Sequence, residues 1–393
     1  MPAPGSHPLV YLDHAATTPV REEVIEAMRP YYGERFGNPS SSHRWGREAR
    51  AALDEARERL GRCLGARPDE ISFTSGGTEG DNLAILGAWR ALKDKGRTAI
   101  VTTPIEHKAI LGAVHQATRE GAEERVLGMT PDGTIDQDSF DHLVDDAVAV
   151  CTMMWVNNEI GSIQPIPELA AKAKARGAMV HTDAVQAFGK IPIDAKSQHF
   201  DFLTISGHKF GAPKGIGALY VRRGTAVEPL MHGGTQERGR RPGTENVAAA
   251  IGLARAAELA VAECQSHCER LDRLRARLEA GIVERVPDAV IHGQGARRAP
   301  HIVNVSVPGT DSESLLMALD LKGIAASGGS ACQSGSISPS HVITALGVRP
   351  DLASAAIRLS LGTLTTEACI DRVLEVFPAL VAKARRLAAA EAS

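Results

Sequence analysis

The sequence predicts an α/β fold: a large domain built on a mostly parallel, mixed sheet flanked by helices, and a smaller α+β domain. Two observations carry this prediction. Short apolar segments alternate with helical segments from residue 71 to residue 221, a rhythm typical of parallel sheets with helices on both faces. Near Glu245 the rhythm gives way to one long helical pattern, which a shorter mixed segment follows.

The first half of the chain supplies the elements of the large domain. The helix after the first strand has Leu83, Leu86 and Leu92 at apolar positions, which is the spacing of a buried helical face. Strands are expected at 71–74, 98–102, 148–156, 178–181, 202–205 and 217–221, and helices at 78–92, 107–120 and 168–176.

The second half begins with a helix expected from 246 to about 286. Leu271, Leu274 and Leu278 recur along it at helical spacing. We place the domain boundary inside this helix, so that 16–256 form the large domain and 1–15 with 257–393 form the small one. Strands at 301–307 and 357–361 and helices at 312–321 and 367–390 complete the small domain.

Composition and charge exclude several classes of protein. With 43% hydrophobic residues the chain is not mainly disordered. Its 44 basic and 47 acidic residues give a net charge of −3, so no overall basic field exists to attract nucleic acid or an anionic membrane. The apolar runs fall short of the roughly 20 residues that span a bilayer. We therefore expect neither nucleic acid nor membrane as a partner.

The six cysteines are too few and too scattered for a disulfide framework, which favours a reducing compartment. Residues 1–10 contain no basic segment followed by an apolar core, so we expect no secretory signal. Together these features predict a cytoplasmic protein.

Two charged residues end neighbouring predicted strands. Lys209 closes Ser206-Gly-His-Lys209, and a lysine whose charge is disfavoured becomes an amine that reacts with carbonyls. Asp183 ends the preceding strand, where a pyridinium nitrogen would pair a buried carboxylate. Taken singly, they are compatible with a surface lysine and a helix N-cap. Taken together, the two strand ends favour a pyridoxal phosphate site.

A glycine-rich turn, Ser75-Gly-Gly77-Thr78, joins the first strand to the first helix. Its N–H groups and the helix N-terminus suit a phosphate, although a simple capped turn has the same sequence features. It is neither a Walker A loop nor a dinucleotide fingerprint, because the glycine spacing differs and no Gly-Lys-Ser/Thr follows.

Several further polar residues follow predicted strands. Ligands of open α/β sheets bind at the carboxyl ends of the strands, so we expect these residues to meet at one site. The set is Gly77, Thr78, His107, Asn158, Asp183, Gln186, Ser206 and Lys209.

One cysteine stands apart from the others. Cys332 lies among small and polar residues, whereas Cys151 lies in an apolar run typical of a structural cysteine. A modest fall in pKa makes such a thiol an effective nucleophile; the alternative is a linker with an incidental cysteine. Cys264 and Cys268 have helical spacing, but no second ligand pair matches them, which disfavours zinc.

The ordered motifs resemble one family over nearly the whole chain: cysteine desulfurases of the NifS/IscS kind, which are class-V, fold-type I pyridoxal phosphate enzymes. The motifs that carry the resemblance are Tyr11-Leu-Asp-His-Ala-Ala-Thr-Thr-Pro, Phe36-Gly-Asn-Pro-Ser, Phe73-Thr-Ser-Gly-Gly-Thr-Glu, Thr103-Pro-Ile-Glu-His-Lys, Val156-Asn-Asn-Glu-Ile-Gly, Ser206-Gly-His-Lys, the segment 232–246, Gly329-Ser-Ala-Cys332 and Ile357-Arg-Leu-Ser-Leu-Gly362.

The resemblance implies roles around the cofactor ring. It implies a Schiff base between pyridoxal 5'-phosphate and Lys209, with the His107 ring stacked on the cofactor as an acid–base group. It places Asp183 on the pyridine nitrogen, Gln186 on the phenolic oxygen and Asn158 near the ring and the substrate.

It also implies roles for the phosphate and the substrate. Thr244 is expected to reach the phosphate of a neighbouring subunit, which implies a homodimer, and Arg358 and Asn38 are expected to hold the substrate carboxylate. The phosphate of the same subunit is expected to be held by Gly77, Thr78, Ser206 and His208, and Gly207 is expected to be a further cofactor-binding residue.

The activity that the resemblance implies is that of a sulfurtransferase acting on L-cysteine. Lys209 removes the Cα proton, the Cys332 thiolate takes the sulfur as a persulfide, and L-alanine leaves. The sulfur is then expected to pass to an acceptor or an iron–sulfur scaffold protein, with transient ligation of iron through Cys332. Alternatives are a selenocysteine lyase, an aminotransferase, or a non-enzymatic protein of the same fold; the segment 330–339 is longer than in selenocysteine-preferring relatives.

Overall fold

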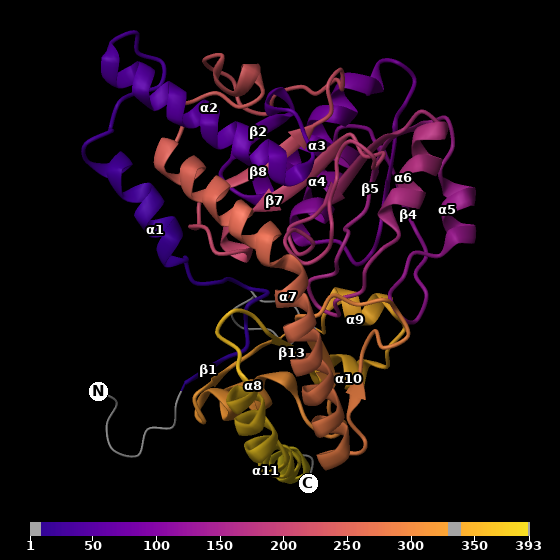
Figure 1. Cartoon of the computed structure of the whole chain (residues 1–393). Coiled ribbons are helices and arrows are strands. Elements are labelled where there is room, and N and C mark those ends of the chain that lie inside the picture. Colours follow the sequence, from indigo (N-terminus) through magenta and orange to yellow (C-terminus); the bar gives the residue numbers. More distant parts are fainter. Residues whose placement is uncertain (1–8, 329–338, 392–393) are drawn as a thin grey trace.

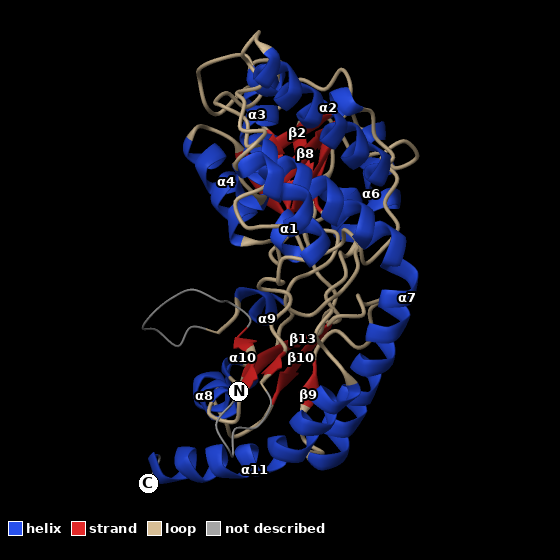
Figure 2. Ribbon diagram, turned by 60° about the vertical axis from the view of Figure 1, so that its left-hand side comes forward, coloured by secondary structure: helices blue, strands red, loops and turns tan. Residues whose placement is uncertain are grey.

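The computed structural model describes residues 9–328 and 339–391 of the chain (Figure 1). Cys332 lies outside the described residues. The large sheet occupies one half of the molecule and a smaller sheet the other, and one helix runs through both (Figure 2). No helix in the described ranges combines the length and apolarity needed to cross a membrane.

Seven strands form the large sheet in the order β2, β8, β7, β6, β5, β3, β4. Only β8 runs antiparallel to its neighbours, so the predicted mostly parallel sheet is confirmed. The strands are β2 (Ile71–Thr74), β3 (Ala99–Thr102), β4 (Glu123–Val126), β5 (Val148–Thr152), β6 (Met179–Asp183), β7 (Phe202–Ser206) and β8 (Gly217–Val221).

Helices cover both faces of this sheet, as predicted. On one face α3 (Gly77–Lys93) and α4 (Lys108–Arg119) pack through a core that includes Trp89 and Ile110. On the other face lie α2 (Arg44–Leu64), α5 (Gln137–Leu143), α6 (Ile166–Ala175) and the first part of α7 (Val247–Arg285), with α1 (Glu22–Met28) packed against α7. Short 3₁₀ turns occur at η1 (Arg29–Tyr32), η2 (Pro68–Glu70), η3 (Gly207–Lys209) and η4 (Gln236–Gly239).

The smaller sheet is antiparallel, with strands in the order β12, β13, β10, β9. At the N-terminal end of the described chain, β1 (Val10–Tyr11) pairs in parallel with β11 (Ile324–Ala325). The remaining elements are β9 (Val290–Ile291), β10 (Ile302–Ser306), β12 (Ser327–Gly328), β13 (Ala356–Ser360), α8 (Ser312–Asp320), α9 (His341–Ala345), α10 (Pro350–Ser354) and α11 (Glu367–Glu391).

The long helix α7 takes part in two separate hydrophobic cores. Residues up to Ala257 belong to the core beneath the large sheet, and residues from Leu271 onward belong to the core of the small sheet. Its bounds agree within one residue with the helix predicted from 246 to about 286. The apolar residues Ile370, Val373, Phe377 and Leu380 of α11 all lie in the second core.

Candidate active site

A pocket of about 360 Å³ opens at the carboxyl ends of the strands of the large sheet, a volume suited to a small molecule. Residues from the N-terminal segment, the large sheet and the small sheet all line it. Of the residues predicted from sequence it is lined by Gly77, Thr78, His107, Asn158, Asp183, Gln186, Ser206, His208, Lys209 and Arg358.

Three predicted residues do not line this pocket. Gly207 is buried beside it, where an added Cβ would lie 2.9 Å from the Cβ of Ala212. Thr244 is exposed, as is Asn38, whose Oδ1 accepts a hydrogen bond from the backbone N–H of Ser40. The roles of Thr244 and Asn38 therefore stay predictions, as does that of Cys332, which lies outside the described part of the chain.

Lys209 projects into the pocket from η3, directly after β7. Its Nζ donates hydrogen bonds to the backbone carbonyls of Ala15 at 2.7 Å and Ala16 at 2.9 Å. Burial, helped by the nearby Arg358 guanidinium, lowers the pKa of Lys209 to about 8. A lysine with a lowered pKa has a substantial neutral fraction near neutral pH, which makes its amine nucleophilic.

Asp183 ends β6 and is 4% exposed. Its Oδ1 accepts a hydrogen bond of 2.8 Å from the N–H of Val185, its one hydrogen bond within the described ranges. Burial first, and then the neighbouring Asp81 carboxyl, raise the pKa of Asp183 to about 7. Such a carboxyl gains from a cationic partner entering the pocket.

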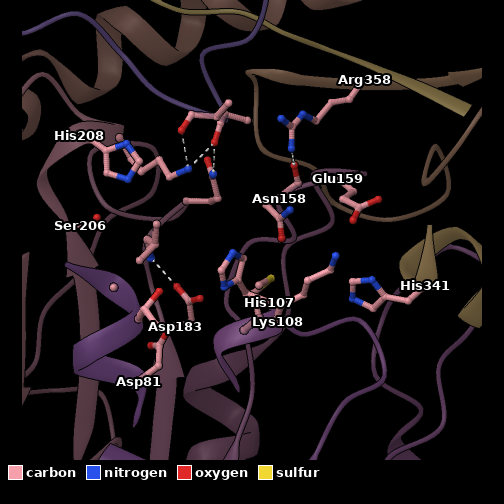
Figure 3. Close-up of a pocket in the computed structure, with 18 residues that line it drawn as sticks. Asp81, His107, Lys108, Asn158, Glu159, Asp183, Ser206, His208, His341 and Arg358 are labelled. Atoms are coloured by element: carbon pink, nitrogen blue, oxygen red, sulfur yellow. Dashed lines mark hydrogen bonds between the residues drawn. The ribbon is translucent and has the colours of Figure 1, made fainter. Parts of the chain in front are cut away.

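The turn between β2 and α3 is the predicted phosphate site. Gly76 has φ +155°, a value that favours glycine, and Gly77 is the first residue of α3. An added Cβ on Gly217 of β8 would lie 2.8 Å from the Cα of Gly76, so the two backbones approach closely here. Ser206 and His208 lie on this side of the pocket, while Arg358 and His341 lie on the other side with His107 between (Figure 3).

His107 is the N-cap of α4. Its Nδ1 accepts a hydrogen bond of 3.1 Å from the N–H of Ala109, which leaves the ring proton on Nε2. Burial lowers the pKa of His107, so the ring is neutral. A neutral imidazole with an Nε2–H can donate a proton or stack on a planar group.

Arg358 of β13 brings the small sheet into the pocket. Its Nη1 donates to the carbonyl of Asn158 and its Nη2 to Oδ1 of Asp13, both at 2.9 Å. Its Nε is buried and has no hydrogen-bond partner among the described residues. The guanidinium therefore keeps one donor in reserve for an anionic ligand.

Comparison with known proteins decides the family: residues 10–373 match the family described as Aminotransferase class-V. The chain belongs to the class-V aminotransferase family. Curated relatives include "Cysteine desulfurase IscS" of Dictyoglomus turgidum, 45% identical over 96% of each chain, and "Cysteine desulfurase NifS" of Azotobacter vinelandii, 45% identical over 96% of this chain and 94% of that one.

Solved structures of similar fold cover nearly the whole chain. A structure named "NIFS-LIKE PROTEIN" has a TM-score of 0.89 and 35% identity, and covers 95% of this chain and all of that one. A NifS-like protein from Rickettsia africae has a TM-score of 0.84 and 31% identity, and covers 95% of this chain and 99% of that one. The predicted resemblance and the fold-type I architecture are confirmed.

Class-V enzymes of this kind depend on pyridoxal phosphate, and the residues present fit that cofactor. A reactive amine suits its aldehyde, a buried carboxyl short of donors suits its ring nitrogen, and a helix N-terminus suits its phosphate. Lys209, Asp183 and the Gly77–Thr78 turn supply these three groups around one pocket.

The class-V site also contains residues that sequence analysis had not singled out. The carbonyls of Ala15 and Ala16 are backbone groups, so no side-chain pattern marks them. Glu159 stands beside Asn158 in a quoted motif and could have been found there. The Nε2–H of His341 donates a hydrogen bond of 2.9 Å to the carbonyl of Glu106, and His341 reaches the pocket from α9. Asp81 and Lys108, one turn into α3 and at the start of α4, complete this group.

Proposed function

We propose that the chain is a pyridoxal 5'-phosphate-dependent L-cysteine desulfurase, which converts L-cysteine into L-alanine and retains the sulfur as a persulfide on Cys332. One observation carries the proposal: Lys209, Asp183 and Arg358 converge on a single pocket in a chain whose relatives, over nearly their full length, bear that name. When bound, the cofactor supplies an electron sink for the bonds at the substrate α-carbon.

The chain's own residues have the following parts. The free Nε–H of Arg358 suits the substrate carboxylate, because an arginine fork matches a carboxylate. Lys209, with its lowered pKa, takes the α-proton in its neutral form and returns it as an ammonium. His107 is placed to donate a proton from Nε2.

Sulfur transfer needs a nucleophile outside these groups. The Cys332 thiolate attacks the substrate sulfur, so that a sulfur–sulfur bond forms while the carbon–sulfur bond breaks with its electrons on carbon. That carbon takes up a proton and leaves as alanine. The persulfide remains available for an acceptor protein.

A first experiment is to assay sulfide and alanine from L-cysteine with wild type, Cys332→Ala and the control Cys369→Ala. We expect Cys332→Ala to bind the cofactor yet lose turnover by about 100-fold or more, because the sulfur then lacks its nucleophile. Cys369→Ala, a half-buried cysteine of α11, should behave as wild type. Mass spectrometry should find a sulfur adduct of about 32 daltons on Cys332. Normal turnover in Cys332→Ala would refute the mechanism.

We further propose a cytoplasmic homodimer that donates sulfur to iron–sulfur cluster assembly or another thio-cofactor pathway. The scattered cysteines support the compartment. Thr244 is exposed and does not line its own subunit's pocket, which supports a role at a neighbouring subunit. The division into 16–256 and 1–15 with 257–393 is supported by the change of core along α7.

A further inference from the structure

A second, smaller cavity of about 50 Å³ meets the active site at Lys209, which lines both. Its walls come from the N-terminal segment, the loop after β6, α7 and the start of β10. Besides Lys209, the polar side chains that line it include His14, Arg21, Lys190, Glu263, His267 and His301.

Two of these histidines are buried without their full set of partners. His14 is 3% exposed, and neither of its ring nitrogens has a hydrogen-bond partner in the described ranges. His301 is 2% exposed; its Nε2 lies 3.1 Å from Oε1 of Gln186, and its Nδ1 has no partner there. Since buried polar atoms nearly always have a partner, these three nitrogens call for an occupant of the cavity.

The charges around the cavity favour an anion. Arg21 and Glu263 neutralise one another through hydrogen bonds of 2.7 and 2.8 Å. Lys190 has neither a carboxylate nor a side-chain hydrogen-bond partner among the described residues. Burial lowers the pKa of Lys190, and only the thiols of Cys268 and Cys264 oppose that effect. Lys190 is half-buried, and an ammonium at such a position without a paired carboxylate gains from a negative counter-ion.

The size of the cavity and the residues that line it argue against a second cofactor, water alone or a metal cation as its occupant. The cavity has room for a few water molecules or one small ion, and is far too small for a second cofactor. Water alone would leave the Lys190 ammonium without a counter-charge. A metal cation would be repelled by the Lys190 ammonium, and the described residues hold no cluster of three or more metal-ligating side chains.

We propose that this cavity binds one small monovalent inorganic anion, held between Lys190 Nζ and a ring N–H of His14. The Nε2 proton of His301 is directed at Gln186, so its Nδ1 accepts a hydrogen bond from an accompanying water. The bound anion places a negative charge next to Lys209, at the point where the cavity meets the active site.

Bromide is the probe, because it is monovalent, small and visible by anomalous diffraction. Crystals of the cofactor-loaded enzyme are soaked in sodium bromide. We expect an anomalous peak inside the cavity within hydrogen-bond distance of Lys190 Nζ. Lys190→Met should lose this peak, whereas the control Lys196→Met, at an exposed position, should keep it. A cavity without bromide, or a peak that persists in Lys190→Met, would overturn the proposal; bromide at surface lysines only would be an adventitious ion only.

A solution measurement covers the case in which Lys190→Met fails to fold. His14→Leu removes the second anion ligand and leaves Lys190 in place. Bromide titrated against the thermal midpoint should give a dissociation constant about tenfold or more weaker in His14→Leu than in wild type. Equal affinity in the two proteins would contradict the site. Neither measurement depends on turnover, so the outcome is independent of the proposed desulfurase activity.

Discussion

Burial sets the charge states of the groups in the pocket. It is the largest cause of the lowered pKa of Lys209, the lowered pKa of His107 and the raised pKa of Asp183. Each shift disfavours the charged form of its residue. The cofactor-free protein therefore holds a neutral imidazole at His107, together with an amine at Lys209 and a carboxyl at Asp183 whose pKa values lie near 8 and 7. A protonated pyridine nitrogen of the bound cofactor would favour the charged form of the Asp183 carboxyl. Cofactor affinity therefore depends on the charge of this residue.

Lys209 offers the sharpest test at the level of a residue. Lys209→Ala should lose the yellow colour of the bound cofactor and lower sulfide release from L-cysteine by about 1,000-fold or more, because the amine and the proton carrier both disappear. The control is Lys214→Ala, an exposed lysine five residues along the same loop, which should retain both. A yellow and active Lys209→Ala would show that the cofactor is held elsewhere.

Glu106 allows a pH-dependent test. Its Oε1 accepts hydrogen bonds of 2.8 Å from Thr103 Oγ1 and the N–H of Met154, and burial raises the pKa of Glu106 to about 8. The ordinary pKa is about 4.3, so the folded state binds this proton more tightly than the unfolded state. Its contribution to stability is present in full below about pH 4 and is lost as the pH rises toward 8.

Glu106→Gln keeps the acceptor but removes the titration. The unfolding free energy of the variant without cofactor should therefore fall less steeply between pH 5 and 8 than that of wild type, by about 1.4 kcal/mol per pH unit. Denaturant unfolding at several pH values measures this difference. The exposed Glu168→Gln is the control and should keep the wild-type slope. Parallel slopes for Glu106→Gln and wild type would show that Glu106 is ionised when folded.

At the level of elements, a strand could be predicted from the sequence when most of its residues were apolar. Fully buried strands such as β7 (Phe202–Ser206) are mainly apolar and were predicted. The edge strand β4 (Glu123–Val126) carries three charged residues and gives no such signal. Strand β8 lies between β2 and β7 and runs antiparallel to both, and no local sequence pattern encodes this direction.

The site could be predicted where side chains follow strands, as at Asp183 and Lys209. It could not be predicted where tertiary packing supplies the group. The carbonyl of Ala15 is a backbone group, and His341 belongs to α9. Only the packing of the two sheets brings these groups to the carboxyl ends of the large sheet.

Substitution of two glycines tests whether the turn between β2 and α3 holds the cofactor phosphate. In Gly217→Ala the new Cβ would lie 2.6 Å from the carbonyl oxygen of Ile205 and 2.8 Å from the Cα of Gly76, so β8 must move against the turn before α3. We expect cofactor affinity to fall about tenfold, and the unfolding free energy by about 1–3 kcal/mol.

The matched control for that change is Gly112→Ala. Gly112 is exposed within α4, and an added Cβ there would meet no atom within 4 Å. This variant should gain about 0.5–1 kcal/mol of stability and bind the cofactor as wild type does, because alanine is the better helix former. A fluorescence titration of cofactor and a denaturant series measure both quantities. Loss of cofactor affinity in both variants would mean that the effect is not specific to the turn between β2 and α3.

At the level of the whole molecule, α7 and the N-terminal segment link the two halves. Arg358 of the small sheet donates to both Asp13 and the carbonyl of Asn158, so its side of the pocket is complete only when the two halves are packed together. Thr244 of the segment 232–246, by contrast, is exposed and does not line this pocket. Within the described chain, Glu237 and Arg238 of that segment are the only non-glycine residues with positive φ. Arg57 holds Glu237 there through two hydrogen bonds of 2.6 and 2.7 Å.

A mixed dimer tests whether Thr244 acts across subunits. If it does, a Lys209→Ala subunit paired with a Thr244→Ala subunit contains one intact site, made of Lys209 from one subunit and Thr244 from the other. The second site then carries both changes. Differently tagged subunits can be co-expressed and the mixed dimer purified through both tags. We expect it to recover about half of the wild-type turnover, well above either parent homodimer. If Thr244 instead serves its own subunit, every site carries one change, and the mixed dimer stays at the average of its parents.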